Sequence, residues 1–248
     1  MLGFLLALVV AVVTLVVNLL ASSKNPPPDV MPTAVPIPTD TPTPEGGTNL
    51  EYILLDDFSG PALDPAKWDG VDTAAPLLYV RDGMLHLQVT PAEGTGENSA
   101  TLRARLPRPV HAVRFELTLL SVDGTNDGGA STIVSRNSAR NHKVGVGPSG
   151  SGAPVIAYDI CAREVGCRDG VYNDFVRPGV EMPIQVQRRY EVVVRRDGPR
   201  WVFEVDGIQQ NTADLEDGPI ESLSYYLYSF GEGTFHATVD DLEVAYAT

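Results

Sequence analysis

Residues 190–207 read YEVVVRRDGPRWVFEVDG and contain the clearest structural pattern in the chain. Apolar and polar residues alternate on both sides of Asp197-Gly198-Pro199, which predicts an antiparallel β-hairpin. With the turn centred on Gly198-Pro199, Val194 lies opposite Phe203. One face of this hairpin is then apolar and the other is largely charged, so the apolar face needs a second layer to pack against.

Many more short strand-like runs follow residue 50, separated by turns rich in Gly, Pro and Asp. We predict strands at 52–55, 77–81, 84–90, 99–106, 110–122, 130–135, 143–146, 154–160, 170–175, 223–230 and 235–246. No long segment of this region has the 3.6-residue period of a helix. The pattern predicts an all-β fold, an antiparallel two-sheet jelly-roll sandwich, over residues 50–248.

The N-terminal residues 2–21 form an apolar run that only Thr14 and Asn18 interrupt. A helix rising about 1.5 Å per residue would span a hydrocarbon core of roughly 30 Å with this run. No Lys or Arg precedes it, whereas a secretory signal begins with a basic region. We therefore predict a transmembrane anchor within residues 1–22. The alternative is a cleaved signal peptide, for which Ala21 and Ser22 offer small residues.

A linker is predicted at residues 23–49, because residues 25–49 hold eight prolines and five threonines. This composition favours extended polyproline II structure and cannot build a core. A stalk between a membrane helix and a domain predicts a single-pass protein of the cell membrane whose domain is extracellular. The protein would be secreted if the N-terminal segment is cleaved, and an ordinary disordered linker is the alternative to a stalk.

The chain is acidic, with a formal net charge of −14. After residue 50 it has 17 basic against 29 acidic side chains. This balance argues against nucleic acid and against an anionic membrane surface as partners. It is compatible with neutral sugars, cations or proteins, and also with a charge that only keeps the domain soluble.

Four short motifs occur in an order that resembles a known superfamily. They are Asp56-Asp57-Phe58 followed by Trp68, then VRDGML at 80–85, FEVDG at 203–207 and VDDLEV at 239–244. Together they resemble concanavalin A-like lectin and glucanase domains, in particular the laminin-G-like and laminarinase-like branches. The resemblance covers nearly all of residues 50–248. It implies a jelly roll whose concave sheet commonly binds carbohydrate, and the superfamily also includes protein-interaction modules, so the fold does not by itself decide the function.

Catalytic residues are not predicted. Laminarinase-like relatives use a Glu-x-Asp-x-x-Glu strand, because residues i and i+2 share a strand face and glycoside hydrolysis needs two nearby carboxyl groups. The nearest match, Glu204-Val205-Asp206, is followed by Gln209 where the second Glu is needed, and glutamine cannot protonate a leaving group. The histidines are scattered along the sequence, and no Gly-x-Ser-x-Gly motif is present. A glycoside hydrolase with an unrecognised site remains an alternative.

Candidate ligand-binding residues come from two stretches. In residues 225–230 the aromatics Tyr226 and Tyr228 share one face; either they fill the core while Tyr225 faces out, or they stack on a sugar. Residues 135–142 form a polar stretch, predicted as a loop, that rims a binding face through Arg136, Asn141 and His142 or is simply solvated. The predicted ligand-binding residues are Arg136, Asn141, His142, Tyr226 and Tyr228.

Two further sites follow from the resemblance and from the cysteines. Some members of the superfamily carry a structural calcium ion, and neighbouring terminal strands would bring Asp56 and Asp57 close to Asp240 and Asp241, oxygen ligands that suit calcium. Cys161 and Cys167 are the only cysteines and predict a disulfide outside the cell. Free thiols are the alternative if the domain is cytoplasmic.

Taken together, these features predict a membrane-tethered extracellular β-sandwich that binds carbohydrate and does not catalyse a reaction. The alternative is an adhesive, protein-binding or sensor ectodomain without affinity for sugars. The predicted partners are the membrane, through the N-terminal helix, and a glycan or a cell-surface protein.

Overall fold

The structure is a computed structural model. It describes residues 49–70, 78–89, 98–122, 130–136, 140–148, 153–162, 180–214, 218–229 and 234–248. The chain divides into two units, residues 1–43 and residues 44–248, and all described residues belong to the second. The predicted membrane helix, the linker up to residue 48 and the predicted strand 170–175 lie outside the described residues. Within the described ranges, no helix has the length and apolarity needed to cross a membrane.

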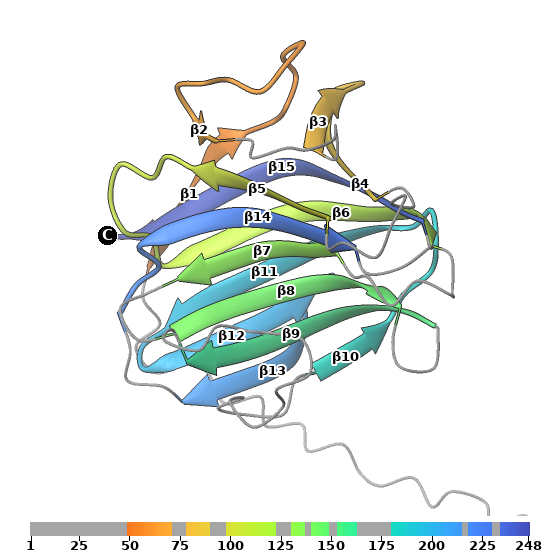
Figure 1. Cartoon of the computed structure of the whole chain (residues 1–248). Helices are drawn as coiled ribbons and strands as arrows, with labels where there is room; N and C mark the ends of the chain where they lie inside the picture. Colours follow the sequence, from red (N-terminus) through yellow and green to blue (C-terminus); the bar gives the residue numbers. More distant parts are fainter. Residues whose placement is uncertain are drawn as a thin grey trace, which may run out of the picture. The chain divides into compact units, whose positions relative to one another are not determined.

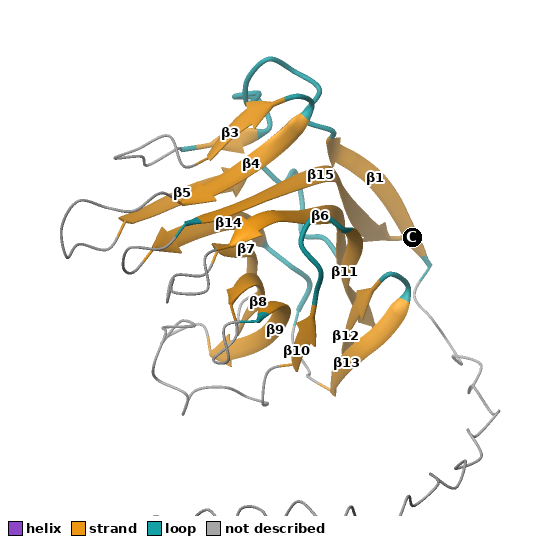
Figure 2. Ribbon diagram, turned by 90° about the vertical axis from the view of Figure 1, so that its right-hand side faces the viewer, coloured by secondary structure: helices purple, strands orange, loops and turns teal. Residues whose placement is uncertain are grey.

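In these described ranges, fifteen strands form two antiparallel sheets that lie one over the other (Figures 1 and 2). Sheet A has the order β13-β12-β11-β6-β15-β4-β3, with β1 paired to β15. Its strands are β1 (Leu50–Asp56), β3 (Leu78–Arg81), β4 (Met84–Val89), β6 (Ala112–Val122), β11 (Arg189–Asp197), β12 (Arg200–Val205), β13 (Ile208–Asp214) and β15 (Phe235–Ala247).

Sheet B has the order β10-β9-β8-β7-β14-β5-β2. Its strands are β2 (Trp68–Asp69), β5 (Asn98–Ala104), β7 (Ala130–Arg136), β8 (Arg140–Pro148), β9 (Pro154–Ala162), β10 (Val180–Pro183) and β14 (Ser222–Ser229). Every described regular element is thus a strand, which confirms the all-β prediction.

The hairpin at residues 190–207 forms as predicted. In the pairing of β11 with β12, Val194 lies opposite Phe203 and Val192 opposite Val205. These four side chains are buried, and Gly198 in the turn has a φ of 58°, a conformation that glycine adopts without strain. The local alternation of apolar and polar residues therefore decided both the register and the buried face.

Sheet B supplies the second layer that the hairpin needs. The His142 ring lies 4.2 Å from the Trp201 ring, and Tyr158 stacks on Phe203 with ring centroids 4.8 Å apart. All four side chains are almost fully buried. Aromatic contacts of this kind join β8 and β9 of one sheet to β12 of the other and hold the two layers together.

One part of the sequence prediction needs correction. Residues 135–142 were predicted as a polar loop, but β7 continues to Arg136 and β8 begins at Arg140. The stretch pairs with itself, Arg136 opposite Asn141. A polar segment can form a strand when one of its faces is solvated, so its polarity did not distinguish the two structures.

Candidate functional site

The outer face of sheet B is the surface where the predicted ligand-binding residues were expected. Residues with alternate parity, such as Val144, Ile156 and Leu227, are buried in the core, so their neighbours along each strand point outward. The described residues of this surface, called the sheet B face below, are Thr101, Arg103, Asn141, Lys143, Gly145, Ala157, Asp159, Glu181, Ser224 and Tyr226.

The centre of the sheet B face is built from small residues. Strand pairing aligns Tyr226, Ser131, Gly145 and Ala157 in one row across β14, β7, β8 and β9. A Cβ atom built on Gly145 would meet only the Lys143 side chain, at 3.9 Å. The small residues of this row therefore form a shallow floor. The half-buried Tyr226 lies two strands away from Gly145, roughly 10 Å at the usual strand spacing.

Tyr225 and Tyr226 have the opposite orientation to the alternative in which Tyr226 fills the core and Tyr225 faces out. Tyr225 is fully buried in the core and Tyr226 lies half-buried on the sheet B face. Burial raises the pKa of the Tyr225 hydroxyl well above its usual value, and its ring packs against Trp68. The side chain of Tyr228 lies outside the described residues.

Two of the other predicted ligand-binding residues occupy different positions from those expected. His142 points into the core, where Nδ1 lies 2.8 Å from the Tyr158 hydroxyl, so it cannot reach the sheet B face. Asn141 has the outward parity, but it is 2% exposed. Its Oδ1 has no hydrogen-bond partner among the described residues. The side chain of Arg136 lies outside the described part of the chain.

Carboxylates on the sheet B face come from its outer strands. Asp159 of β9 lies opposite Lys143 of β8, and Glu181 of β10 lies opposite Ala157. Glu181 and Asp159 are therefore diagonal neighbours, a relation that puts Cα atoms about 7–8 Å apart. Strand β8 itself carries no carboxylate.

The outer face of sheet A, called the sheet A face below, is instead covered by ion pairs. Arg195 of β11 bonds Glu204 of β12 at 2.9 Å. Arg188 bonds Asp206 at 2.8 Å. The two carboxylates that partly match a glycosidase motif are therefore each paired with an arginine on this face.

The aspartates considered as calcium ligands have separate roles. Strand β1 does pair with β15, as expected for the terminal strands. However, Asp56 turns inward and accepts hydrogen bonds from Trp68 Nε1 at 2.6 Å and Lys67 Nζ at 3.1 Å. Asp57 accepts bonds from the backbone N–H and the hydroxyl of Ser59, which lower its pKa.

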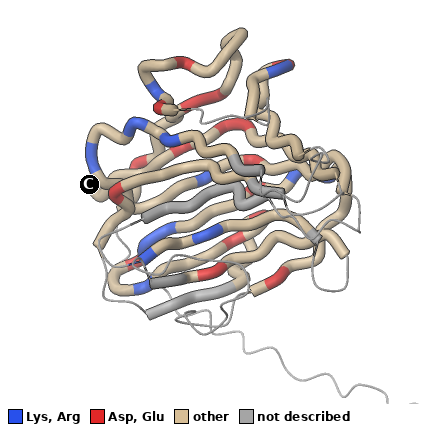
Figure 3. Tube along the Cα trace, viewed as in Figure 1, with Lys and Arg blue, Asp and Glu red and all other residues tan. Residues whose placement is uncertain are grey.

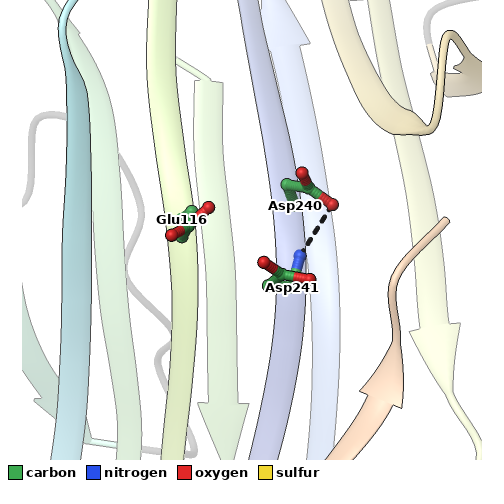
Figure 4. Close-up of side chains that lie close together, drawn as sticks. All are labelled: Glu116, Asp240 and Asp241. Atoms are coloured by element: carbon green, nitrogen blue, oxygen red, sulfur yellow. Dashed lines mark hydrogen bonds between the residues drawn. The ribbon is translucent and has the colours of Figure 1, made fainter.

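Glu116 joins Asp240 and Asp241 in a carboxylate cluster on the sheet A face (Figure 4). One oxygen from each lies within 4.8 Å of the others, and the backbone N–H of Asp241 donates to Asp240 at 2.9 Å. Burial, with the neighbouring Asp241 and Asp57, raises the pKa of Asp240 even though Arg189 lowers it.

This cluster does not fit a calcium ion as it stands. The Arg189 guanidinium forms ion pairs with Glu116, with Asp241 at 3.5 Å and with Asp240 at 3.9 Å. A cation bound by the three carboxylates would face that guanidinium at close range, and like charges repel. Arg189 therefore provides the counter-charge that a metal would otherwise supply.

A histidine pair is the feature that the sequence did not reveal. His86 and His236, 150 positions apart, meet on the sheet A face with His86 Nδ1 and His236 Nε2 at 2.8 Å. His111 lies elsewhere, beside Arg196. The predicted disulfide is not described, because Cys167 lies outside the described residues.

Comparison with known proteins identifies the fold. No protein-family model matches the chain, and no curated protein is similar in sequence. Among solved structures, a non-specific endo-β-1,3(4)-glucanase of glycoside hydrolase family 16 aligns with a TM-score of 0.58 at 14% identity, covering 84% of this chain and 98% of that one.

Two further structures agree. A laminarinase catalytic domain from Thermotoga petrophila has a TM-score of 0.57 at 10% identity, covering 81% of this chain and 100% of that one. A structure from work on endo-acting O-glycanases of the human gut microbiota has a TM-score of 0.57 at 15% identity, covering 82% and 99%. The described fold is thus the concanavalin A-like jelly roll of the laminarinases, which confirms the resemblance seen in the sequence.

Proposed function

We propose that the domain binds carbohydrate on the sheet B face and does not cleave it. The single observation that carries this proposal is the row through Tyr226 and Gly145, which combines an aromatic ring with a floor of small residues. Sugar rings present an apolar face to aromatic side chains and hydroxyl groups to polar ones. Ser224 and Lys143, one row away, offer such polar groups.

The absence of catalysis in this proposal rests on the placement of carboxylates. Glycoside hydrolysis needs two carboxyl groups flanking the scissile bond. Strand β8, at the floor of the sheet B face, has none, and Glu204 and Asp206 lie on the sheet A face in ion pairs. A glycan held over β14, β7 and β8 would meet no carboxylate of those strands, because Asp159 and Glu181 lie farther out on β9 and β10.

The proposal includes a location outside the cell. The apolar run at residues 2–21 and the proline-rich residues 25–49 support a membrane anchor followed by a spacer. The negative charge of the domain suits a position in solvent above the membrane, because anionic lipids repel it. Neutral glycans at the cell surface or on a neighbouring cell are then the ligands that the domain meets.

A glycan array with the purified protein tests the proposal. We expect saturable binding to a neutral glycan, lost in Gly145→Leu, because a Cβ atom at this position meets no backbone atom and the rest of the leucine would cover the floor. Circular dichroism should show that this variant keeps the wild-type fold. Binding that persists in folded Gly145→Leu protein would place the glycan elsewhere.

A second candidate function has one specific observation in its favour. Asp159 and Glu181 are diagonal neighbours on β9 and β10, so two carboxyl groups project from one face, and glycoside hydrolysis needs two carboxyl groups on either side of one bond. Release of reducing ends from β-glucans, abolished by Asp159→Asn, would establish a hydrolase. If there is neither binding nor hydrolysis, the protein-binding alternative stands, with the exposed Ile53 and Leu54 of β1 as its first surface to test.

A further inference from the structure

The His86–His236 pair lies on the opposite side of the sandwich from the proposed glycan site. On β4 and β15, His86 is opposite Thr238 and His236 is opposite Gln88, so the two imidazoles are diagonal neighbours on one face. His86 Nδ1 and His236 Nε2 are 2.8 Å apart. Two ring nitrogens that are distant in sequence therefore converge on one point.

The ring of His86 is fixed on its far side. His86 Nε2 lies 3.1 Å from the carbonyl oxygen of Arg81, and because a carbonyl only accepts, Nε2 carries the proton. Tyr79 stacks on the imidazole with ring centroids 4.9 Å apart and planes 11° apart. The Nδ1 lone pair of His86 is thus aimed at His236 by contacts that do not involve His236.

A backbone carbonyl that holds one ring nitrogen while the other is free to coordinate is the arrangement typical of metal-bound histidines. A metal ion needs an imidazole nitrogen with a free lone pair, and His86 Nδ1 presents one because the proton of this ring lies on Nε2. Of the nearby charges, Asp82 favours a cation at His86 and Arg81 opposes it.

We propose that His86 and His236 form a binding site for one divalent transition-metal ion of the zinc, copper or nickel type. Imidazole suits these ions, whereas calcium and magnesium prefer oxygen ligands. Two imidazole nitrogens on a tetrahedral ion, each bonded at about 2.0–2.1 Å, are roughly 3.4 Å apart. The half-buried His236 has to retreat only a little to admit the ion.

The hydrogen bond between the two imidazoles contains one proton, which must move when a metal ion binds. In the metal-free protein the Nε2–H of His236 donates to His86 Nδ1. When the ion binds, that proton moves to His236 Nδ1 by tautomerisation, so both coordinating nitrogens present lone pairs. Within the described residues, the one group of three or more metal-binding side chains is the Glu116 cluster, so water completes the coordination at the histidine pair.

Isothermal titration of the full chain in detergent micelles with ZnCl₂ and CuCl₂ at pH 7.5 tests the site. We expect one saturable equivalent, weakened at least about tenfold in His86→Gln and in His236→Gln. His111→Gln is the matched control, because this histidine has no second imidazole in contact among the described residues, and it should bind like wild type. Unchanged binding in both site variants, or no binding in the wild type, would overturn the proposal.

A measurement on the wild-type protein tests the same metal site without variants that have to fold. In nitrogen NMR spectra of the histidine side chains, zinc should shift the resonances of His86 Nδ1 and His236 Nε2. The resonances of His111 and His142 should not change. Shifts at other histidines alone would refute the site. Glycan binding should be the same with and without zinc, since the two sites lie on opposite faces, so failure of one proposal does not imply failure of the other.

Discussion

The two outer faces of the sandwich differ in the size of the side chains at their centres. On the sheet A face, arginines and carboxylates pair with one another, as Arg114 does with Glu243 and Arg195 with Glu204. On the sheet B face, small residues occupy the middle, and charged residues (blue and red in Figure 3) lie on the strands around them. Long paired side chains cover the sheet A face, whereas the small residues of the sheet B face leave room for a ligand, so the comparison points to sheet B for binding.

Both faces are supported by one shared interior, and Asp56 links the two sheets there. It ends β1 of sheet A and bonds Trp68 of β2 in sheet B. We expect Asp56→Ala to lower the free energy of unfolding by roughly 3 kcal/mol, because a buried charged acceptor and its donors are separated. Urea denaturation measures this loss.

Asp57→Ala is the matched control for Asp56→Ala, since within the described residues the nearby Ser59 donates the hydrogen bonds that Asp57 accepts, and Asp57 is solvated. Its effect should be much the smaller of the two. Equal losses would mean that the link between the sheets does not depend on the buried carboxylate.

The next prediction tests the two faces directly with two tyrosines. Tyr226 lies half-buried on the sheet B face, and Tyr52 lies half-buried on the sheet A face over Arg114. Tyr226→Ala should weaken glycan binding about tenfold or more, the usual effect of removing an aromatic anchor. Tyr52→Ala should leave the affinity unchanged in the same titration, and the reverse result would transfer the binding site to sheet A.

A smaller effect is expected for a single ion pair on the sheet A face. Arg195→Gln removes bonds to Glu204 at 2.9 Å and Asp197 at 3.4 Å, all of them partly solvated. The free energy of unfolding should fall by less than about 1 kcal/mol. A double-mutant cycle with Glu204→Gln measures the coupling, and a much larger value would show that this face stabilises the fold and does more than balance charge.

The smallest expected effect is the gain in stability when the Asp240 charge is removed, and this gain depends on pH. The folded protein raises the pKa of Asp240 above its ordinary value of 3.8, chiefly by burial, so folding favours the protonated acid. Its contribution to stability is therefore fully present below pH 3.8 and is lost as the pH rises through the folded pKa. Asp240→Asn should raise the melting temperature slightly at pH 7, and the gain should vanish at low pH; a loss at pH 7 would mean that attraction to Arg189 outweighs burial.

Much of the architecture follows from local sequence. The hairpin register, the buried face of β11 and β12, and the pairing of Leu78–Arg81 with Met84–Val89 come from alternation and turn residues within a few positions of each other. The order of the four short motifs identified the jelly roll. The hairpins are local, so neighbouring residues are enough to specify them, whereas the motif order extends over the whole domain.

The candidate sites depended on information that alternation does not contain. A period of two shows that Tyr225 and Tyr226 face opposite ways, but not which of them is buried. His142 was expected in a loop, where no alternation assigns a face, and the polarity of Asp56 gave no sign that it would bond Trp68 in the interior. Each of these outcomes was decided by the layer that packs against the strand.

The sequence by itself determined most of the strands, the tight hairpins and the class of fold, because backbone geometry and the alternation of side chains act over a few residues; β10 and β13 were not predicted. Only the tertiary structure brought His86 to His236, set Arg189 among Glu116, Asp240 and Asp241, and turned the sheet B face outward with Gly145 at its centre. Those contacts join strands far apart in the chain, and their register is set by how the two sheets bury a common core.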